Sequence, residues 1–81
     1  MNLNDQTAAA LKKTRERRGV KVADLSEAMD LSLDALYRLE SGKTGLGIRH
    51  IESAAERLGM TPRGLLSELA SEVEKAHHER G

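Results

Sequence analysis

The sequence of 81 residues contains no cysteine, one proline and a single aromatic residue, Tyr37. Without cysteine, neither a disulfide nor a thiolate metal site can stabilise the fold, and a cytoplasmic location is compatible with the composition. Without Phe or Trp, the core must be built from Leu, Ile, Val, Met and Ala. A chain of this length has one small core, so we expect its stability to be modest or shared with a second subunit.

Long apolar runs, targeting signals and strand patterns are also missing. No stretch approaches the length of a membrane span, and the N-terminus lacks a signal-peptide pattern. We therefore expect a soluble, cytoplasmic protein that contacts no membrane. No internal repeat or low-complexity linker occurs, which predicts a compact all-α fold. It should form one domain over residues 1–81, with a core of about 6–69 and a helical extension or frayed tail over 70–81.

The net charge is zero, but the charges are unevenly distributed. Residues 1–50 hold nine Lys or Arg against seven Asp or Glu, while residues 51–81 hold four against six. A local positive face can bind phosphate on a neutral protein, because counterion release depends on the contacts made. A charge run of this kind can equally be a solvated helix face.

Helical periodicity and end signals predict five helices. Gly19 and Gly59 suit the left-handed position that ends a helix, and Thr61 followed by Pro62 is a strong helix start. Asn4 or Asp5 can cap the first helix. The predicted ranges are about 6–18, 22–29, 33–41, 48–58 and 62–77. The fourth helix is expected to bury Ile48, Ile51, Ala54, Ala55 and Leu58.

The segment from Val20 to Gly42 carries the most specific pattern. Apolar residues recur at helical spacing in two short helices, and between them Asp30 tolerates the left-handed conformation of a short turn. Ser32 can then accept a hydrogen bond from the free amides of the second helix. Two short helices around such a turn form a helix-turn-helix, whose second helix enters the DNA major groove.

The string R-E-R-R-G-V-K-V-A-D-L-S-E-A-M-D-L-S-L-D-A-L-Y-R-L-E-S-G-K, residues 15–43, resembles the Cro and phage-repressor type of helix-turn-helix domain, also called the xenobiotic-response-element type. The resemblance covers roughly residues 8–69. Its pattern residues are Arg15, Gly19, Leu25, Ser32, Leu36, Glu40 and Gly42. It implies a five-helix, lambda-repressor-like fold with an extended C-terminal helix, and a transcriptional regulator, of repressor or controller type, that binds operator DNA as a dimer. It also implies an ion pair between Arg15 and Glu40 across helices one and three.

The resemblance places the base-reading positions on the helix at 33–41, at Leu33, Asp34, Tyr37 and Arg38. Arg38 is the best candidate for a guanine contact, Leu33 for a thymine methyl and Asp34 for a cytosine amino group, while Tyr37 can reach a phosphate. Alternatively, Arg38 pairs with Asp34 at i,i+4. The phosphate-contact candidates are Lys21, Val22, Ser32, Lys43, Thr44, Gly45, Arg49, Arg17 and Arg18. Val22 and Lys21 replace the Gln and the Ser or Thr that are common in this family, so we expect the backbone amides at the start of that helix to hold a phosphate without side-chain help.

The last helix is longer than a minimal domain of this type requires. Leu66, Leu69, Val73 and Ala76 recur at spacings of three, four and three, which is typical of a helix-packing seam. A symmetric dimer through this helix would set two recognition helices about 34 Å apart. The alternative is a solvated, Glu-rich tail after about Ala70.

No pattern indicates an enzyme, a cofactor site or a metal site. A nucleophile elbow and a glycine-rich phosphate cradle are both absent. Glu74, His77 and His78 could hold only an adventitious divalent ion. Two other functions remain open beside the DNA-binding regulator. One is a protein-interaction module whose Leu33 and Asp34 surface binds a protein partner, and the other is an antitoxin-like regulator that combines both tasks.

Overall fold

The structure is a computed structural model that describes the backbone of residues 2–80 and the side chains of residues 2–76. Over that range it contains helices and no strand. The helices are α1 (Leu3–Arg17), α2 (Val22–Ala28), α3 (Leu33–Glu40), α4 (Ile48–Arg57) and α5 (Pro62–Arg80). The all-α, five-helix fold is confirmed, and the boundaries lie within a few residues of the predicted ones.

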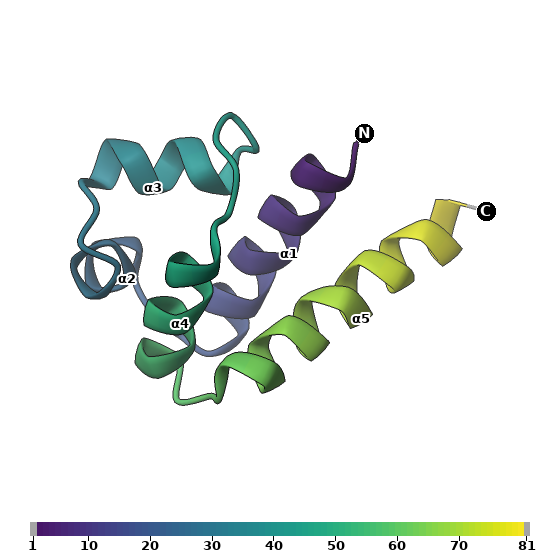
Figure 1. Cartoon of the computed structure of the whole chain (residues 1–81). Helices are drawn as coiled ribbons and strands as arrows, with labels where there is room; N and C mark the ends of the chain where they lie inside the picture. Colours follow the sequence, from purple (N-terminus) through teal and green to yellow (C-terminus); the bar gives the residue numbers. More distant parts are fainter. Residues whose placement is uncertain (1, 81) are drawn as a thin grey trace.

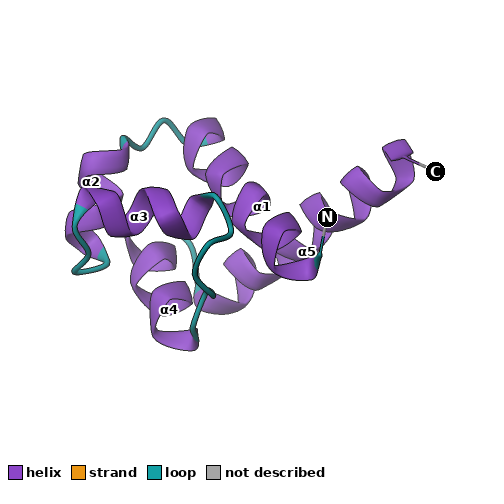
Figure 2. Ribbon diagram, turned by 90° about the horizontal axis from the view of Figure 1, so that it is seen from above, coloured by secondary structure: helices purple, strands orange, loops and turns teal. Residues whose placement is uncertain are grey.

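The helices form one packed body in which α1 contacts both α3 and α5. Helix α2 packs on α3 and α4, and α4 packs on α5. Figure 1 shows α1 and α5 side by side, with α2 and α3 away from α5 and with α4 leading into the start of α5. In Figure 2 the last turns of α5 extend beyond the rest of the molecule. The helix-turn-helix is therefore supported by α1 and α4 rather than by α5.

The core is aliphatic, as the composition requires. One fully buried leucine comes from each of four helices: Leu11, Leu25, Leu36 and Leu65. Helix α4 contributes small residues to the centre, where Ala54 and Ala55 are inaccessible to solvent. Leucines from α1, α2, α3 and α5 thus pack with small alanines from α4, and together they fill the interior without aromatic rings.

Local side-chain chemistry sets the helix ends. Asp30 has φ 56° in the turn before α3, and Ser32 Oγ accepts a hydrogen bond from the Ala35 amide at 3.1 Å. Thr61 Oγ1 accepts from the Gly64 amide at 3.0 Å, as expected before Pro62. These predictions from local sequence are confirmed.

The predicted cap of α1 is wrong. Asn2 caps the helix, with its side-chain oxygen accepting from the Asp5 amide at 2.9 Å. Asn4 lies inside the helix and donates from Nδ2 to the Gly42 carbonyl at 2.7 Å. Asn2, Asn4 and Asp5 are all residues of types that can cap a helix. The contact with Gly42, 38 positions away, is what distinguishes Asn4 from Asn2.

The prediction that Ile48 is buried is also wrong, because 73% of its surface is exposed. Ile48 is the first residue of α4, whereas Ile51, Ala54, Ala55 and Leu58 are buried as predicted. Periodicity alone places position 48 on the buried face with position 51. The side chain instead lies at the end of the helix, where no neighbouring helix covers it.

Gly42 is required at the end of α3 for two reasons. Its φ is +82°, and a Cβ there would overlap the Asp5 carboxylate and lie 3.1 Å from the Asp5 Cα. Gly19 has a similar φ of +69° but open space around it. We expect Gly42→Ala to lower the free energy of unfolding by at least about 1 kcal/mol more than Gly19→Ala, since only Gly42 adds a clash to the left-handed strain. Urea unfolding of both variants checks this, and equal losses would contradict it.

None of the described helices is long and apolar enough to cross a membrane.

Candidate nucleic-acid interface

Helices α2 and α3 pack against each other through buried apolar residues. Leu25 of α2 and its C-cap residue Met29 belong to the common core together with Leu36 and Leu39 of α3. Buried residues occupy one side of α3, so the side chains between them point outward. The outward residues are the four base-contact candidates: Leu33, Asp34, Tyr37 and Arg38.

All four candidates are accessible to a ligand. Leu33 is 48% exposed and Tyr37 57%, while the side chains of Arg38 and Asp34 are 63% and 84% exposed. Arg38 Nε lies 3.6 Å from Asp34 Oδ2, so the i,i+4 pair that competes with base contact is formed. A pair this exposed is weak, so it does not prevent Arg38 from turning to a guanine.

A buried ion pair fixes α3 against α1. Arg15 Nε donates to Glu40 Oε2 at 2.7 Å and Arg15 Nη2 donates to Glu40 Oε1 at 3.2 Å. The remaining Nη1 donates to the Val20 carbonyl at 3.0 Å. The side chains of Arg15 and Glu40 are only 9% and 4% exposed. This bidentate geometry holds the recognition helix in one orientation.

The residues after α3 form an exposed rim. Lys43, Thr44 and Gly45 are exposed, and Arg49 is exposed in the first turn of α4. Lys43 also lines a hollow between α3 and α1, together with Lys12 of α1, Tyr37 and Arg38. Lys12 was not among the predicted phosphate contacts, because a lysine in a basic run has no local signal that distinguishes it. Its position beside α3 adds it to the candidate interface.

The start of α2 offers backbone rather than side chains. Lys21 is the exposed N-cap residue and makes no side-chain cap hydrogen bond. The Val22 side chain is half-buried and packs against the core, so Val22 can reach a phosphate only through its backbone amide. Ser32 caps α3 with its side chain.

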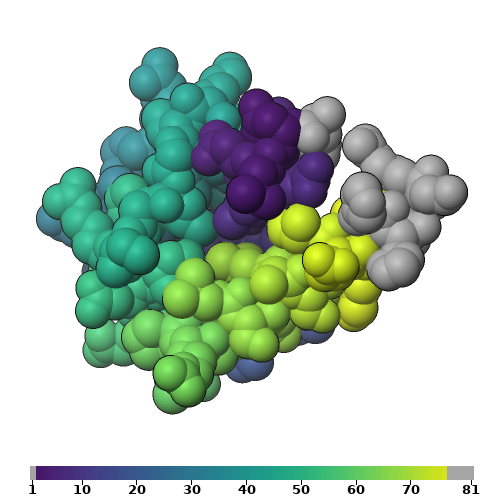
Figure 3. All heavy atoms as spheres, turned by 45° about the vertical axis from the view of Figure 1, so that its right-hand side comes forward, coloured from purple at the N-terminus to yellow at the C-terminus, as the bar shows by residue number. Residues whose placement is uncertain are grey.

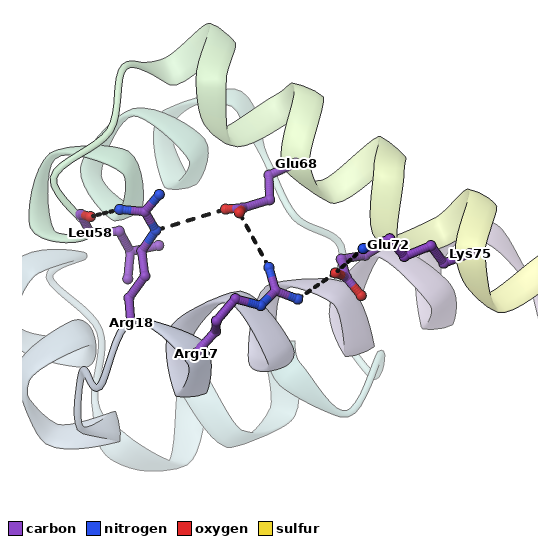
Figure 4. A network of polar contacts seen from close by, with 6 residues as sticks. All are labelled: Arg17, Arg18, Leu58, Glu68, Glu72 and Lys75. Carbon is purple, nitrogen blue, oxygen red and sulfur yellow. Dashed lines mark hydrogen bonds and ion pairs between the residues drawn. The ribbon is translucent and has the colours of Figure 1, made fainter.

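Arg17 and Arg18, two of the predicted phosphate contacts, have partners on other parts of the same chain. Their guanidinium groups lie against α5 and the end of α4 (Figure 4). Arg17 pairs with Glu68 at 3.2 Å and with Glu72, and Arg18 donates to the Leu58 carbonyl at 3.0 Å. Both arginines lie at the C-terminal end of α1, and a phosphate contact by either one would compete with these partners.

Glu72, one of the two partners of Arg17, has a lowered pKa. The hydrogen bond from Arg17 holds the pKa of the Glu72 carboxyl below its ordinary range, against the opposing effect of desolvation, and Lys75 and Lys13 lower it further. The lowered pKa means that Glu72 is ionised whenever the protein is near neutral pH. Only 7% of its side chain is exposed. The Arg17–Glu72 pair therefore links α1 to α5 under ordinary conditions.

This pair predicts how stability depends on pH. Because the pKa of Glu72 is lower in the folded state, its stabilisation is complete above the ordinary carboxyl pKa and is lost as pH falls through the lowered one. We expect the free energy of unfolding to fall between about pH 5 and pH 3, and to fall less in Glu72→Gln than in the wild type. Urea unfolding across this range checks the slope. Glu52→Gln, which replaces an exposed acid on α4, is the control, and identical slopes for the two variants would contradict the prediction.

The dimer-seam candidates do not form one exposed stripe. Leu69 is 3% exposed in the core of its own chain, and Val73 packs against that core. Leu66 is half-exposed and Ala76 is partly exposed further along α5. The spacing of three and four describes packing within the chain as well as it describes packing between chains. Leu69 is thus a core residue and not a free interface residue.

An apolar groove of about 410 Å³ lies beside α5 instead. Leu69 and Val73 form part of its wall, and three exposed residues project at its edges: Leu3, Ile48 and Leu66. Figure 3 shows the face on which the start of α1, the region of α4 and helix α5 meet. Sequence periodicity did not place Leu3, Leu46 or Ile48 beside α5, because they come from two helix starts and a loop that only the fold brings to it.

No metal centre is found among the described residues. No group of three His, Cys, Asp or Glu side chains lies close enough together to hold an ion in this part of the chain. Of the residues considered for an adventitious ion, the side chains of His77 and His78 lie outside the described range.

Comparisons with known proteins find a helix-turn-helix family and similar solved structures. A family model described as a helix-turn-helix domain matches residues 6–69. A crystal structure of the clp gene regulator ClgR from Corynebacterium glutamicum is similar, with a TM-score of 0.82 and 26% identity over 99% of this chain and 85% of that one. A second ClgR structure has a TM-score of 0.75 and 30% identity over 88% of this chain and 92% of that one. A search of curated proteins gave no match.

Proposed function

The chain belongs to the helix-turn-helix domain family, and on this basis we propose that it is a cytoplasmic transcriptional regulator that binds operator DNA and has no catalytic activity. The observation that carries the proposal is the outward side of α3. Four exposed residues with base-reading or phosphate-reading chemistry share this side, while Leu36, Leu39 and Glu40 anchor the opposite side. A helix anchored in this way can enter the major groove as a rigid body.

Phosphate contacts would come from both sides of α3. Thr44, Gly45 and Arg49 lie on one side of the reading residues, and the start of α2 supplies its N-terminal dipole. Lys12 and Lys43 add positive charge on the other side, in the hollow between α3 and α1. Each such contact releases counterions, so binding should weaken steeply with salt even though the whole chain is neutral.

We further propose that the chain binds DNA as a homodimer. The apolar groove and the exposed Leu3, Ile48 and Leu66 at its edges form a surface with both projecting and hollow apolar parts. Two copies related by a two-fold axis could bury this surface against each other. The pairing would bring two copies of α3 to half-sites about 34 Å apart.

A protein-interaction module is the second candidate. Leu33 and Tyr37 expose apolar surface on the reading side of α3, and Asp34 adds a negative charge between them. An exposed apolar surface with one negative charge is a surface that a protein partner can bind. The DNA-binding function is favoured because basic residues surround α3 on both sides, as a phosphate backbone requires.

The experiment is selection of bound fragments from random DNA, followed by affinity measurements from 50 to 200 mM salt, roughly the range in which phosphate contacts dominate. We expect Arg38→Ala to weaken binding to the selected site by about 1–3 kcal/mol with little effect on unrelated DNA. Lys43→Ala should weaken binding to both and reduce the salt slope by about one. Absence of salt-sensitive binding to any fragment would contradict the proposed function.

A further inference from the structure

Asp34 and Arg38 lie on the exposed side of α3, between two hollows. One hollow lies between α3 and α1 and is lined by Lys12, Tyr37 and Lys43 among others. A second hollow lies between α3 and the chain that leads into the first turn of α4, where Thr44, Gly45 and His50 form its wall. Asp34 and Arg38 line both hollows. These two side chains therefore form the ridge that would go furthest into a DNA groove.

The charge of Asp34 is unexpected on this ridge. The carboxylate is 84% exposed and has Arg38 Nε at 3.6 Å as its nearest cation. Asp34 lies in the first turn of α3, where a negative charge interacts favourably with the helix dipole. That interaction does not require the carboxylate to be on the side of the helix that faces DNA. In a groove the carboxylate meets phosphates of the same charge. An ionised carboxylate also accepts hydrogen bonds and donates none, so among the bases it suits the amino group of cytosine.

We propose that Asp34 is a specificity-determining residue that acts mainly by weakening binding to the wrong DNA. This inference rests on the proposed function. Where a cytosine amino group faces Asp34, the carboxylate accepts a hydrogen bond from it. Where no amino group faces Asp34, the negative charge is desolvated near phosphates without a hydrogen-bond donor, which weakens binding. Discrimination then comes from the penalty on other sequences as well as from attraction to the operator.

The first test compares two variants at this position with the wild type. Fluorescence anisotropy measures affinity for the selected operator duplex and for an unrelated duplex of equal length at 50, 100 and 200 mM KCl, as approximate steps in ionic strength. We expect Asp34→Ala to bind the unrelated duplex several-fold more tightly, and to reduce the ratio of operator to unrelated affinity by about 5- to 150-fold. Asp34→Asn should shift the preferred base at one position toward adenine, which an amide reads through N6 and N7.

The matched control is Asp24→Ala. Asp24 also lies in the first turn of a helix and pairs with an arginine, Arg57, at 3.6 Å, but it lines a hollow between α2 and α4 that does not involve α3. The Asp24→Ala substitution therefore removes the same charge as Asp34→Ala from a similar position on a helix. An affinity ratio for Asp24→Ala close to that of the wild type is expected. Equal effects of Asp24→Ala and Asp34→Ala would reduce Asp34 to a contribution to total charge and overturn the inference.

The outcomes separate this inference from the proposed function. If the wild type binds neither duplex, the proposed function fails. If the wild type binds DNA with the expected salt dependence but Asp34→Ala and Asp34→Asn keep its affinity ratio and base preference, only the role of Asp34 fails. Thermal melting of each variant establishes that it is folded, and Asp34→Asn keeps the side-chain shape should Asp34→Ala unfold.

Discussion

Glu40→Ala should lower the free energy of unfolding by about 3–5 kcal/mol, the loss typical of a buried charge that is left without its partner. Arg15 would keep only its hydrogen bond to the Val20 carbonyl, while the two nitrogens that now donate to Glu40 would be buried without acceptors. For a domain of this size the melting temperature should fall by more than about 10 °C. Differential scanning calorimetry measures both quantities.

The control for this prediction is Glu52→Ala, which removes an exposed carboxylate from α4 and should change the free energy of unfolding by less than about 0.5 kcal/mol. A double variant, Arg15→Met with Glu40→Leu, tests the mechanism. It removes both charges together, so it should recover much of the stability that Glu40→Ala loses. Similar melting temperatures for Glu40→Ala and Glu52→Ala would show that the Arg15–Glu40 pair has little structural role.

Leu66→Lys should abolish the proposed dimer and weaken operator binding by about 100-fold or more, because a monomer loses the effective concentration that a second half-site provides. Leu66 is half-exposed at the edge of the apolar groove, so a lysine there should leave the monomer folded. The added positive charge cannot weaken DNA binding by repulsion. A loss of affinity would therefore report a loss of dimer.

Sedimentation equilibrium gives the oligomeric state and anisotropy gives the affinity. Ser67→Lys is the matched control, since it adds the same charge at the neighbouring exposed position of α5, outside the groove. It should remain dimeric and bind the operator as the wild type does. A monomeric wild type at micromolar concentration, or a Leu66→Lys variant that stays dimeric, would contradict the proposed interface.

Residues whose role is set by near neighbours could be predicted from the sequence. Asp30 in the turn, Ser32 as a cap and Thr61 before Pro62 act over three or four positions, so a short window contains everything that determines them. The helix-turn-helix could be predicted for the same reason, whereas the base-reading positions on its second helix came from the family resemblance. The position of Glu40 beside Arg15, 25 positions apart, came from family resemblance and not from local pattern.

Contacts that depend on how α5 returns to α1 could not be predicted. Arg17 lies 51 and 55 positions from Glu68 and Glu72, and a basic run gives no sign of which members face another helix. Leu69 has the residue spacing of a helix–helix interface because a helix that packs on the core of its own chain follows the same geometry as a helix that packs on a partner chain. Ile48 was misplaced because periodicity locates a face of a helix but not the end at which its neighbours stop.

The alternation of anchored and outward residues along α3 has a consequence for variation. Leu36, Leu39 and Glu40 are buried, while the residues at 33, 34, 37 and 38 are exposed. Mutations at the exposed set cost little folding energy, so a gene library randomised at only these codons should yield mostly folded proteins. Duplicated copies of such a gene could diverge in the sites they recognise while sharing one unchanged scaffold.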